Sequence, residues 1–127
     1  MLNGKEMGPK PVKKYKAIFR LPYQPGILTA ETLDEQGKMV SSHSLTTAGN
    51  ETVLTGTPEK KVLRANGQDL CYLPIEFTDR AGNLKPYIEQ RVEITVDGAA
   101  TLAGFGSALC KTDEVFDKPF HNSYRGR

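Results

Sequence analysis

The sequence predicts an all-β protein, and three observations carry that prediction. Short segments alternate apolar and polar residues with a period of two, which is typical of half-buried strands. Turn residues recur about every 8 to 12 positions, as in β-sandwiches. No window of about ten or more residues shows helical periodicity. With 12 glycines and 8 prolines among 127 residues, we expect an immunoglobulin-like β-sandwich made of two small consecutive modules, residues 1–50 and 51–127.

The second module is organised around residues 65–83. Within this stretch, side chains that we expect to face inward alternate with side chains that we expect to face outward. This alternation predicts a strand of about eight or nine residues with one face buried. Asn66-Gly67 precedes this strand and Asp79–Asn83 follows it, and both are turn sequences. We expect it to be the central strand. The inward set is Cys71, Leu73, Ile75 and Phe77, and the outward set is Tyr72, Pro74, Glu76 and Thr78.

The first module reads as a series of turns and strands. Asn3-Gly4 is the preferred pair for a tight hairpin turn. Strands are expected at 15–21, 27–33 and 39–47, separated by turns at 22–26 and 35–38. So short a segment buries little surface by itself, so we expect it to pack against a neighbour.

A basic stretch precedes and enters the first of these strands. It has two interpretations: an anion-binding patch, or a solvated edge strand that lysines protect from pairing with other chains. We prefer the second. The residues are Lys10, Lys13, Lys14, Lys16 and Arg20.

The remaining strands of the second module are short. We expect strands at 52–54 and 61–63 around a Thr57-Pro58 turn, then a connection at 84–89. Further strands are expected at 92–96 and 101–105. Residues 107–127 show no long periodic segment, although Val115-Phe116 and Pro119-Phe120 could pack against the core.

Composition excludes several classes of partner. A net charge of +2 is too small to indicate nucleic acid or an anionic membrane. No apolar run approaches the ~18 residues of a membrane span, which predicts a soluble chain; its compartment is not indicated. A disulfide between Cys71 and Cys110 is conceivable in a sandwich, but we prefer Cys71 as a small buried residue. No cluster has metal-ligand spacing, so we expect no metal or other cofactor.

We expect no catalytic residue. Carboxylates such as Glu76, Asp79, Glu93 and Asp97 fall on outward strand positions or in turns, where each is a solvated or turn residue. His43 is expected on the same strand face as Met39 and Leu45, and His121 in a C-terminal loop. Neither histidine has a partner at ligand spacing, so structural or exposed roles are favoured. Ser107 lacks the surrounding sequence of a hydrolase nucleophile.

Two binding functions stay open. In a carbohydrate-binding module, aromatic side chains in or beside loops would stack on sugar faces, and the candidates are Tyr23, Tyr87, Phe105 and Tyr124. An immunoglobulin-like spacer or adhesin domain of a bacterial surface protein would show an internal repeat. Residues 1–50 do not repeat 52–127 convincingly.

The order of the motifs adds a resemblance. Residues 65–70 with the following strand and Asp79-x-x-Gly82-Asn83 resemble bacterial immunoglobulin-like domains. The runs 92–98 and 102–106, with Phe116 and Tyr124–Arg127, resemble more narrowly the C-terminal immunoglobulin-like domain of bacterial glycoside hydrolase family 2 enzymes, chiefly β-galactosidases. The first module is similar to the small domain that precedes it in those enzymes, and the matching pieces are 2–5, 22–30, 37–38 and 47–49.

This resemblance implies a non-catalytic part of a larger retaining glycosidase that hydrolyses terminal β-galactosides. The two catalytic carboxylates would lie on a separate (β/α)₈ barrel, absent from this sequence. The resemblance also implies one more strand at each end, so we expect a chain truncated at both ends. Its partner would be the rest of the enzyme, and unpaired strand edges could also support self-association.

Overall fold

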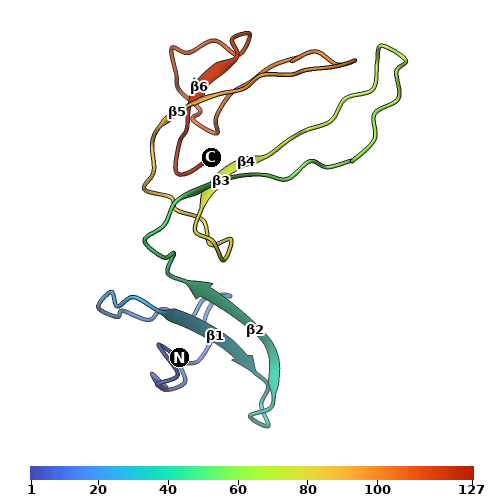
Figure 1. The fold of residues 1–127 in the computed structure, drawn as a ribbon. Coiled ribbons are helices and arrows are strands. Elements are labelled where there is room, and N and C mark those ends of the chain that lie inside the picture. The colour runs from blue at the N-terminus through green and yellow to red at the C-terminus, as the bar shows by residue number, and fades with distance from the viewer. The chain divides into compact units, whose positions relative to one another are not determined.

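The computed structural model describes all residues, Met1–Arg127, and contains strands but no helix (Figure 1). The prediction of an all-β class is confirmed. The strands pair as three two-stranded antiparallel sheets, β1–β2, β3–β4 and β5–β6. The chain divides into two compact units, Met1–Thr47 and Ala48–Arg127. The strands are β1 Ile27–Leu33, β2 Met39–Thr46, β3 Val53–Gly56, β4 Ile75–Thr78, β5 Arg91–Glu93 and β6 Phe120–Asn122.

The division of the chain falls close to the expected boundary after residue 50. That each unit is an independent domain stays a prediction. No helix in the structure has both the length and the apolar character needed to cross a lipid bilayer.

The hairpin β1–β2 dominates the first unit and confirms the strands predicted there. Its turn is held by Asp34, whose Oδ1 accepts hydrogen bonds from the backbone N–H groups of Gln36 (3.0 Å) and Lys38 (2.8 Å). The register slips between Thr32 and Leu33, because Val40 is left without a partner in a β-bulge.

The bulge also changes which side chains share a face. His43 and Leu45 pair with Ala30 and Leu28, whereas Met39 pairs with Leu33. Because alternate residues of a strand point to opposite faces, Met39 lies opposite His43 and Leu45. The predicted common face of all three is therefore wrong, since one extra residue reverses the alternation.

A short N-terminal segment pairs with the other edge of β1. Leu2 bridges Leu28, and the Asn3 N–H donates to the Ile27 carbonyl at 2.8 Å. Asn3 (φ 50°) and Gly4 (φ 78°) form the predicted tight turn between Leu2 and Lys5. The strand β1 therefore lies between this segment and β2, and β2 is left as the open edge.

The strand predicted at 15–21 is absent. Lys13 instead pairs with Lys16 across a two-residue turn, in which Lys14 (φ 49°) and Tyr15 (φ 61°) are both left-handed. Alternation shows which side chains could share a face, but a strand also needs a hydrogen-bonding neighbour. Both edges of β1 are already paired, and this segment pairs only with itself.

In the second unit, β4 is the central strand, as predicted, but it is shorter than predicted. It pairs with β3 on one side, and on the other the Phe77 N–H donates to Gly126 O and the Phe77 carbonyl accepts from Lys85 N, both at 2.8 Å. Beyond β3 and β4, two backbone hydrogen bonds still join the two chain segments, but the ladder is interrupted. Thr57 N donates to Pro74 O and Glu59 N donates to Tyr72 O, both at 3.0 Å. Pro58 and Pro74 have no N–H to donate, which explains the interruption.

Burial along β4 follows its neighbours rather than the predicted alternation. Phe77 and Thr78 are buried on opposite faces of the strand, Cys71 is half-buried, and Leu73 is 43% exposed. The predicted inward set therefore holds at Phe77 and fails at Leu73. The reason is that the strand is covered only at its C-terminal end.

Several short-strand predictions in this unit are wrong. Residues 61–63 and 101–105 form no strand, and no turn occurs at Thr57-Pro58, since the pairing runs on to a turn at residues 65–68. The strand expected at 92–96 is shortened to β5. Its partner β6, which contains His121, was missed, because an unalternating three-residue strand leaves no periodic signal.

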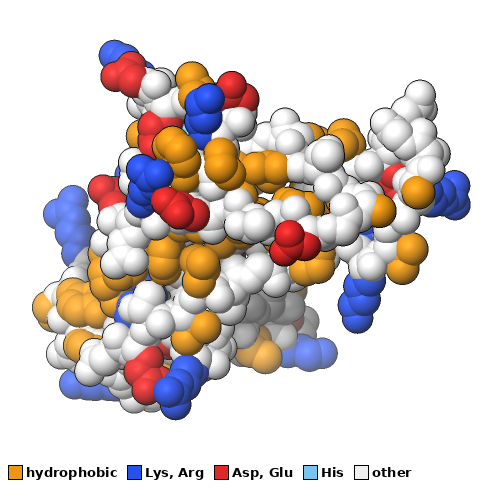
Figure 2. Space-filling model, turned by 45° about the horizontal axis from the view of Figure 1, so that its top comes forward, with side chains coloured by type: hydrophobic (Ala, Val, Ile, Leu, Met, Phe, Trp, Pro, Cys, Tyr) orange, Lys and Arg blue, Asp and Glu red, His pale blue; other side chains and the backbone are white.

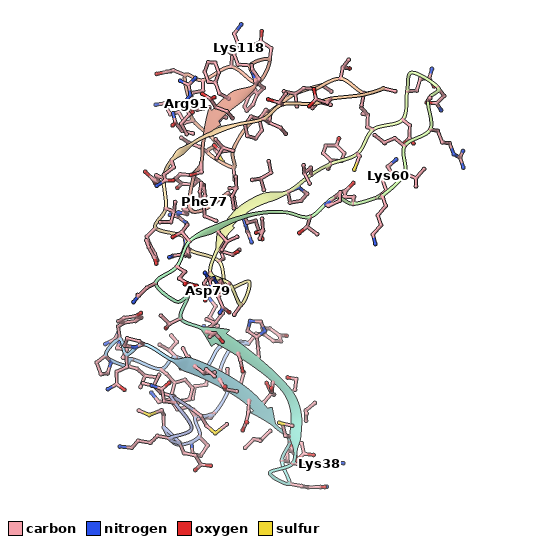
Figure 3. All side chains as sticks on the ribbon, in the orientation of Figure 1. Lys38, Lys60, Phe77, Asp79, Arg91 and Lys118 are labelled. Carbon is pink, nitrogen blue, oxygen red and sulfur yellow. The ribbon has the colours of Figure 1, made fainter.

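The core of the second unit is small. Its buried hydrophobic side chains are Phe77 and Val92, and no residue of the first unit is buried. Figure 3 labels Phe77, which lies in β4, and Asp79, which follows this strand directly. The buried polar and charged residues are Thr78, Asp79, Lys85, His121 and Ser123.

Candidate functional site

Asp79 is the anchor of the turn that follows β4. Its Oδ2 accepts hydrogen bonds from Asn83 Nδ2 (2.9 Å) and Gly49 N (2.7 Å). Its Oδ1 accepts from the N–H groups of Asn83 (2.8 Å) and Ala81 (2.9 Å). These donors, the Asn83 side chain above all and then Gly49, lower the pKa of the Asp79 carboxyl to about 2. Asp79 is therefore a structural carboxylate.

Lys85 holds the start of the second unit against the segment after β4. Its side chain is fully buried, and its ammonium donates to the carbonyls of Asn50 (2.9 Å) and Glu51 (2.8 Å) and to Thr52 Oγ1 (2.8 Å). The three donors of the ammonium thus meet three neutral acceptors, with no carboxylate among them. Sequence reasoning missed this residue, because lysine is almost never fully buried and nothing in the local pattern marks it.

His121 of β6 is the other fully buried polar side chain. Its ring stacks on Phe116, with centroids 5.6 Å apart, and meets Phe105 edge-on at 6.3 Å. Nδ1 lies 3.1 Å from the Asn122 carbonyl and 3.3 Å from Glu114 Oε2, whereas Nε2 is buried without a partner. The predicted loop location of His121 is wrong. Its environment is a packed aromatic contact, with no second histidine beside it.

The second unit contains a largely exposed arm, which we define as residues 57–74. Beyond β3 and β4 the two chain segments of the arm run outward to the turn at 65–68 (Figure 1). Asn66 Oδ1 accepts from Gln68 N (3.0 Å) and Asp69 N (2.9 Å), which confirms the predicted Asn66-Gly67 turn. The tip of the arm is therefore a defined turn.

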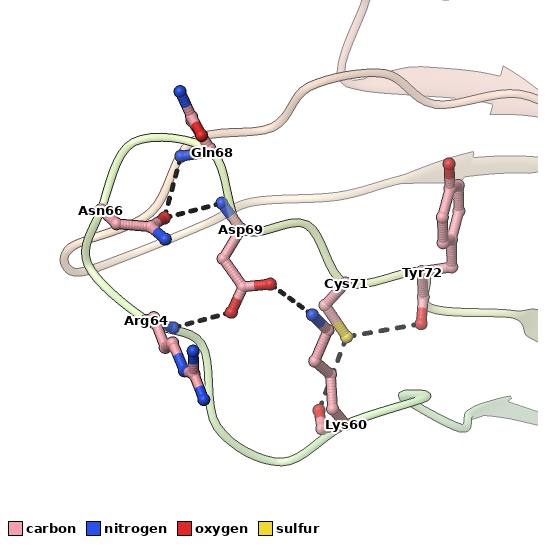
Figure 4. A network of polar contacts seen from close by, with 7 residues as sticks. All are labelled: Lys60, Arg64, Asn66, Gln68, Asp69, Cys71 and Tyr72. Atoms are coloured by element: carbon pink, nitrogen blue, oxygen red, sulfur yellow. Dashed lines mark hydrogen bonds and ion pairs between the residues drawn. The ribbon is translucent and has the colours of Figure 1, made fainter.

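The Asp69 carboxylate joins the two segments of the arm next to this turn (Figure 4). One carboxylate oxygen accepts from the Arg64 N–H at 2.8 Å, and the other pairs with the Lys60 ammonium. The Arg64 N–H and then Lys60 hold the pKa of Asp69 below its usual value, and the bond to Asp69 raises the pKa of Lys60. Cys71 lies beside this pair, and its thiol is free. Cys110 is also a free cysteine.

The braced arm carries apolar side chains that the rest of the chain leaves partly or largely exposed. Each of them is at least 43% exposed, although the arm's backbone is held in place. Figure 2 shows hydrophobic side chains reaching the surface of the molecule in many places on the face drawn. A rigid frame with uncovered apolar groups is suited to docking. The residues are Val62 (77%), Leu63 (43%), Leu70 (57%), Tyr72 (67%) and Leu73 (43%).

The structure does not gather the four aromatic residues proposed for sugar contact. Tyr23 is 79% exposed in the first unit, and Tyr87 is 67% exposed beside Lys85, whose Nζ lies 5.7 Å from the ring centroid. Phe105 is half-buried against His121, and Tyr124 is half-buried with Arg125 5.3 Å from its ring. No aromatic contact in the structure joins any two of the four. A role for them in sugar binding stays a prediction.

The carboxylates that sequence analysis considered have local partners or lie in turns. Glu76 pairs with Arg127 Nε (2.6 Å) and Glu93 with Arg91 Nε (3.1 Å). Asp97 precedes the bend at Gly98. A retaining glycosidase needs two carboxylates about 5 to 5.5 Å apart at a substrate site. The two hollows of the first unit have no carboxylate in their lining.

Comparison with known protein families shows which family this chain belongs to. Residues 54–127 match glycoside hydrolase family 2 C-terminal domain 5. The chain belongs to this family. Residues 1–41 match a domain of unknown function, DUF4982. The family 2 resemblance seen in the sequence is thus confirmed.

Similar proteins extend the family 2 match over nearly the whole chain. The beta-galactosidase BoGH2A of Bacteroides ovatus is 30% identical over 99% of this chain. A solved family 2 glycosyl hydrolase from Bacteroides cellulosilyticus DSM 14838 has a TM-score of 0.92 and 28% identity over 98% of the chain. Another from Bacteroides cellulosilyticus has a TM-score of 0.78 and 29% identity over 84%. The chain spans 15% of the β-galactosidase and 18% and 14% of the solved chains.

Proposed function

We propose that these residues are a non-catalytic module of a family 2 β-galactosidase, and that they act by packing against the rest of that enzyme through the arm. The parent would hydrolyse terminal β-galactosides. The family match and the beta-galactosidase relative support the parent's identity. The braced, uncovered arm supports the mode of action, and it is the observation on which the packing role rests.

The exposed surface of the chain supports packing against a partner. Its accessible surface is 10843 Å² for a mass of 14.0 kDa. A compact folded monomer of this mass exposes about 6,700 Å², and two separate compact units of 47 and 80 residues together expose about 8,000 Å². The excess is larger than the ~800 Å² that each partner contributes to a standard interface.

The arm is a better candidate for this contact than the rest of the excess surface, because its order does not depend on a partner. Asn66 accepts hydrogen bonds from the N–H groups of Gln68 and Asp69 at the tip of the arm. Asp69 accepts a hydrogen bond from the Arg64 N–H group and pairs with the Lys60 ammonium. A preorganised surface loses little conformational entropy on binding. Apolar side chains on such a surface contribute their burial to association with little ordering cost.

A matched pair of substitutions in the full-length enzyme tests this proposal. Val62→Asp places a charge at the most exposed apolar side chain of the arm, whereas Lys61→Asp places the same new residue one position away, where the native side chain is already charged and exposed. We expect Val62→Asp to lower the melting temperature of the enzyme and to reduce kcat/KM for a β-galactoside. The buried charge would cost more than ~2 kcal/mol in a docked arm. Lys61→Asp should leave both values unchanged.

The catalytic part of the proposal has its own test. The chain of residues 1–127 alone should not hydrolyse a β-galactoside, and deletion of these residues should destabilise the enzyme that carries them. Hydrolysis by the isolated chain would contradict the non-catalytic role. Equal melting temperatures for the native enzyme, Val62→Asp and Lys61→Asp would contradict docking through the arm.

A further inference from the structure

The loop that replaced the predicted strand in the first unit has unusual charge. We define the cationic loop as residues 10–20, which hold Lys10, Lys13, Lys14, Lys16 and Arg20 and no carboxylate. The loop therefore has a formal charge of +5, whereas the whole chain has +2. None of these five cations takes part in an ion pair in the structure. The loop thus presents uncompensated positive charge.

An edge-protecting role does not explain these lysines. Lysine on an edge strand prevents pairing with other chains, but the segment forms no strand, and the open edge of the hairpin belongs to β2. The interpretation preferred from sequence therefore loses its structural basis. The anion-binding interpretation does not depend on a strand.

Four of the lysines line a shallow hollow together with apolar side chains. The hollow has a volume of about 460 Å³ and is open to solvent. Lys10 is held in place, with its Nζ donating to the Ile18 carbonyl at 2.9 Å and lying 5.0 Å from the centroid of Phe19. The hollow is lined by Lys10, Lys13, Lys14 and Lys16 together with Pro11, Ala17 and Ile18.

The tip of the loop adds an aromatic ring. Tyr15 is fully exposed and follows Lys14 in the two-residue turn, where both residues have positive φ. Each non-glycine residue in this conformation costs about 1 kcal/mol or more, and such strain is found at functional sites. The turn therefore presents an exposed tyrosine ring between lysines that line the hollow, Lys13 and Lys14 on one side in sequence and Lys16 on the other.

We propose that the cationic loop binds an acidic polysaccharide, with lysines pairing with sugar carboxylates and Tyr15 stacking on a sugar ring. Lysine is depleted in the cores of protein–protein interfaces, whereas a hydrated ligand leaves its strongly hydrated ammonium in contact with water. An exposed aromatic ring suits the apolar face of a sugar. The loop belongs to the first unit and the arm to the second, so this proposal does not depend on the packing role.

The test uses the chain of residues 1–127 and two charge-reversal variants. The loop variant is Lys13→Glu, Lys14→Glu and Lys16→Glu. The control is Lys38→Glu, Lys61→Glu and Lys111→Glu, which changes three exposed lysines outside the loop. Each variant changes the formal charge by six, from +2 to −4, so the pair separates local from overall electrostatics. Binding to polygalacturonate and to neutral galactan is measured by calorimetry at low and high salt.

We expect the native chain to bind polygalacturonate in preference to galactan, and salt to weaken that binding. The loop variant should lose about tenfold or more in affinity, because it replaces attraction at contact distance by repulsion. The control should lose less than about threefold, because its three lysines lie outside the loop and do not line the hollow. Tyr15→Ala should weaken binding at both salt concentrations, because stacking is not screened.

Three outcomes would overturn the proposal. The first is no binding of polygalacturonate by the native chain. The second is an equal loss in the loop and control variants, which would show a response to net charge alone. The third is an absence of polysaccharide binding together with weaker association of the loop variant with the rest of the enzyme, which would assign the loop to an acidic protein surface. Equal circular dichroism spectra of all variants, together with equal unfolding midpoints, establish that both units keep their structure.

Discussion

The two units of this chain are stabilised in different ways. The first unit, Met1–Thr47, consists of a hairpin and turns held by backbone and short side-chain hydrogen bonds, and none of its residues is buried. The second unit, Ala48–Arg127, buries Phe77 and Val92 together with polar groups, some of which have partners far away in sequence. Asp79 reaches back 30 residues to Gly49, and Lys85 reaches back 33 to 35 residues.

The difference shows that regular secondary structure and stability are separate properties. The longest strands are in the first unit, yet a hairpin is marginally stable without a hydrophobic face covered by a neighbour. The second unit has strands of only three or four residues, but long-range polar contacts tie its segments together. We therefore expect the second unit to be the one that folds cooperatively.

The largest expected effect comes from separating the units. Residues 48–127 produced alone should show a cooperative unfolding transition, because their buried contacts lie within the unit. Residues 1–47 alone should show none, since no side chain is buried. Circular dichroism during urea titration measures both. A cooperative transition in the first unit would mean that hydrogen bonds and turns alone stabilise it.

Truncation of one apolar side chain in each unit sharpens the same contrast. Phe77→Ala should lower the free energy of unfolding by about 3 kcal/mol, because it removes a buried aromatic ring from a small core. Leu28→Ala should cost less than about 1 kcal/mol, because Leu28 is 39% exposed in a unit without a core. Urea unfolding of the full chain measures both, and similar losses would contradict the assignment of the core to the second unit.

Two glycine substitutions test how much the close packing of backbone segments contributes to the stability of the second unit. Gly126 has φ 78°, and a Cβ there would lie 2.6 Å from the Lys85 carbonyl oxygen, which cannot move aside easily because it is backbone. Gly82 has φ 84° with open space around it. Gly82→Ala should cost about 1 kcal/mol for the left-handed conformation alone.

Gly126→Ala should cost about 2 kcal/mol more than Gly82→Ala, because the Phe77–Gly126 hydrogen bond must also shift. The difference between the two unfolding free energies is the measurement. If the two variants are equally stable, the C-terminal residues do not pack closely against the segment after β4.

The smallest effect is the pH dependence contributed by Asp79. Hydrogen bonds that favour its ionised form lower the pKa of the folded state to about 2, below the unfolded value of ~3.9. The group therefore stabilises the fold at pH values above ~4, and this contribution decreases as pH falls toward 2. Urea midpoints measured between pH 5 and 2 should decline less in Asp79→Asn than in the native chain. Parallel declines in the two proteins would exclude Asp79 as a source of acid sensitivity.

Turn chemistry made much of the fold predictable. The turns at Asn3-Gly4, 35–38, Asn66-Gly67 and 79–83 formed where expected, because each depends on a side chain and backbone only a few residues apart. The strands β1 and β2 were predicted almost to the residue, since one short turn joins them and sets their pairing. Local interactions are encoded in neighbouring residues, and a sequence displays these directly.

The failures have a common cause. Residues 15–21 alternate like a strand but pair with no strand of the hairpin, although the outer edge of β2 is open, and the prolines at 58 and 74 interrupt a ladder whose partner was unknown. Nothing near Lys85 predicts its burial, because its three acceptors come from residues 50–52. The candidate arm shows the same limit, since the sequence located its turn but not the outward extension that leaves Val62 and Tyr72 uncovered.

The amino-acid sequence alone therefore determined the β class, the positions of the tight turns and the family resemblance. Tertiary structure decided which alternating segments became strands, which polar groups were buried and which apolar groups stayed exposed. The physical reason is that alternation and turn propensity are properties of a few adjacent residues. Strand pairing and burial instead depend on segments that meet only after the chain has folded.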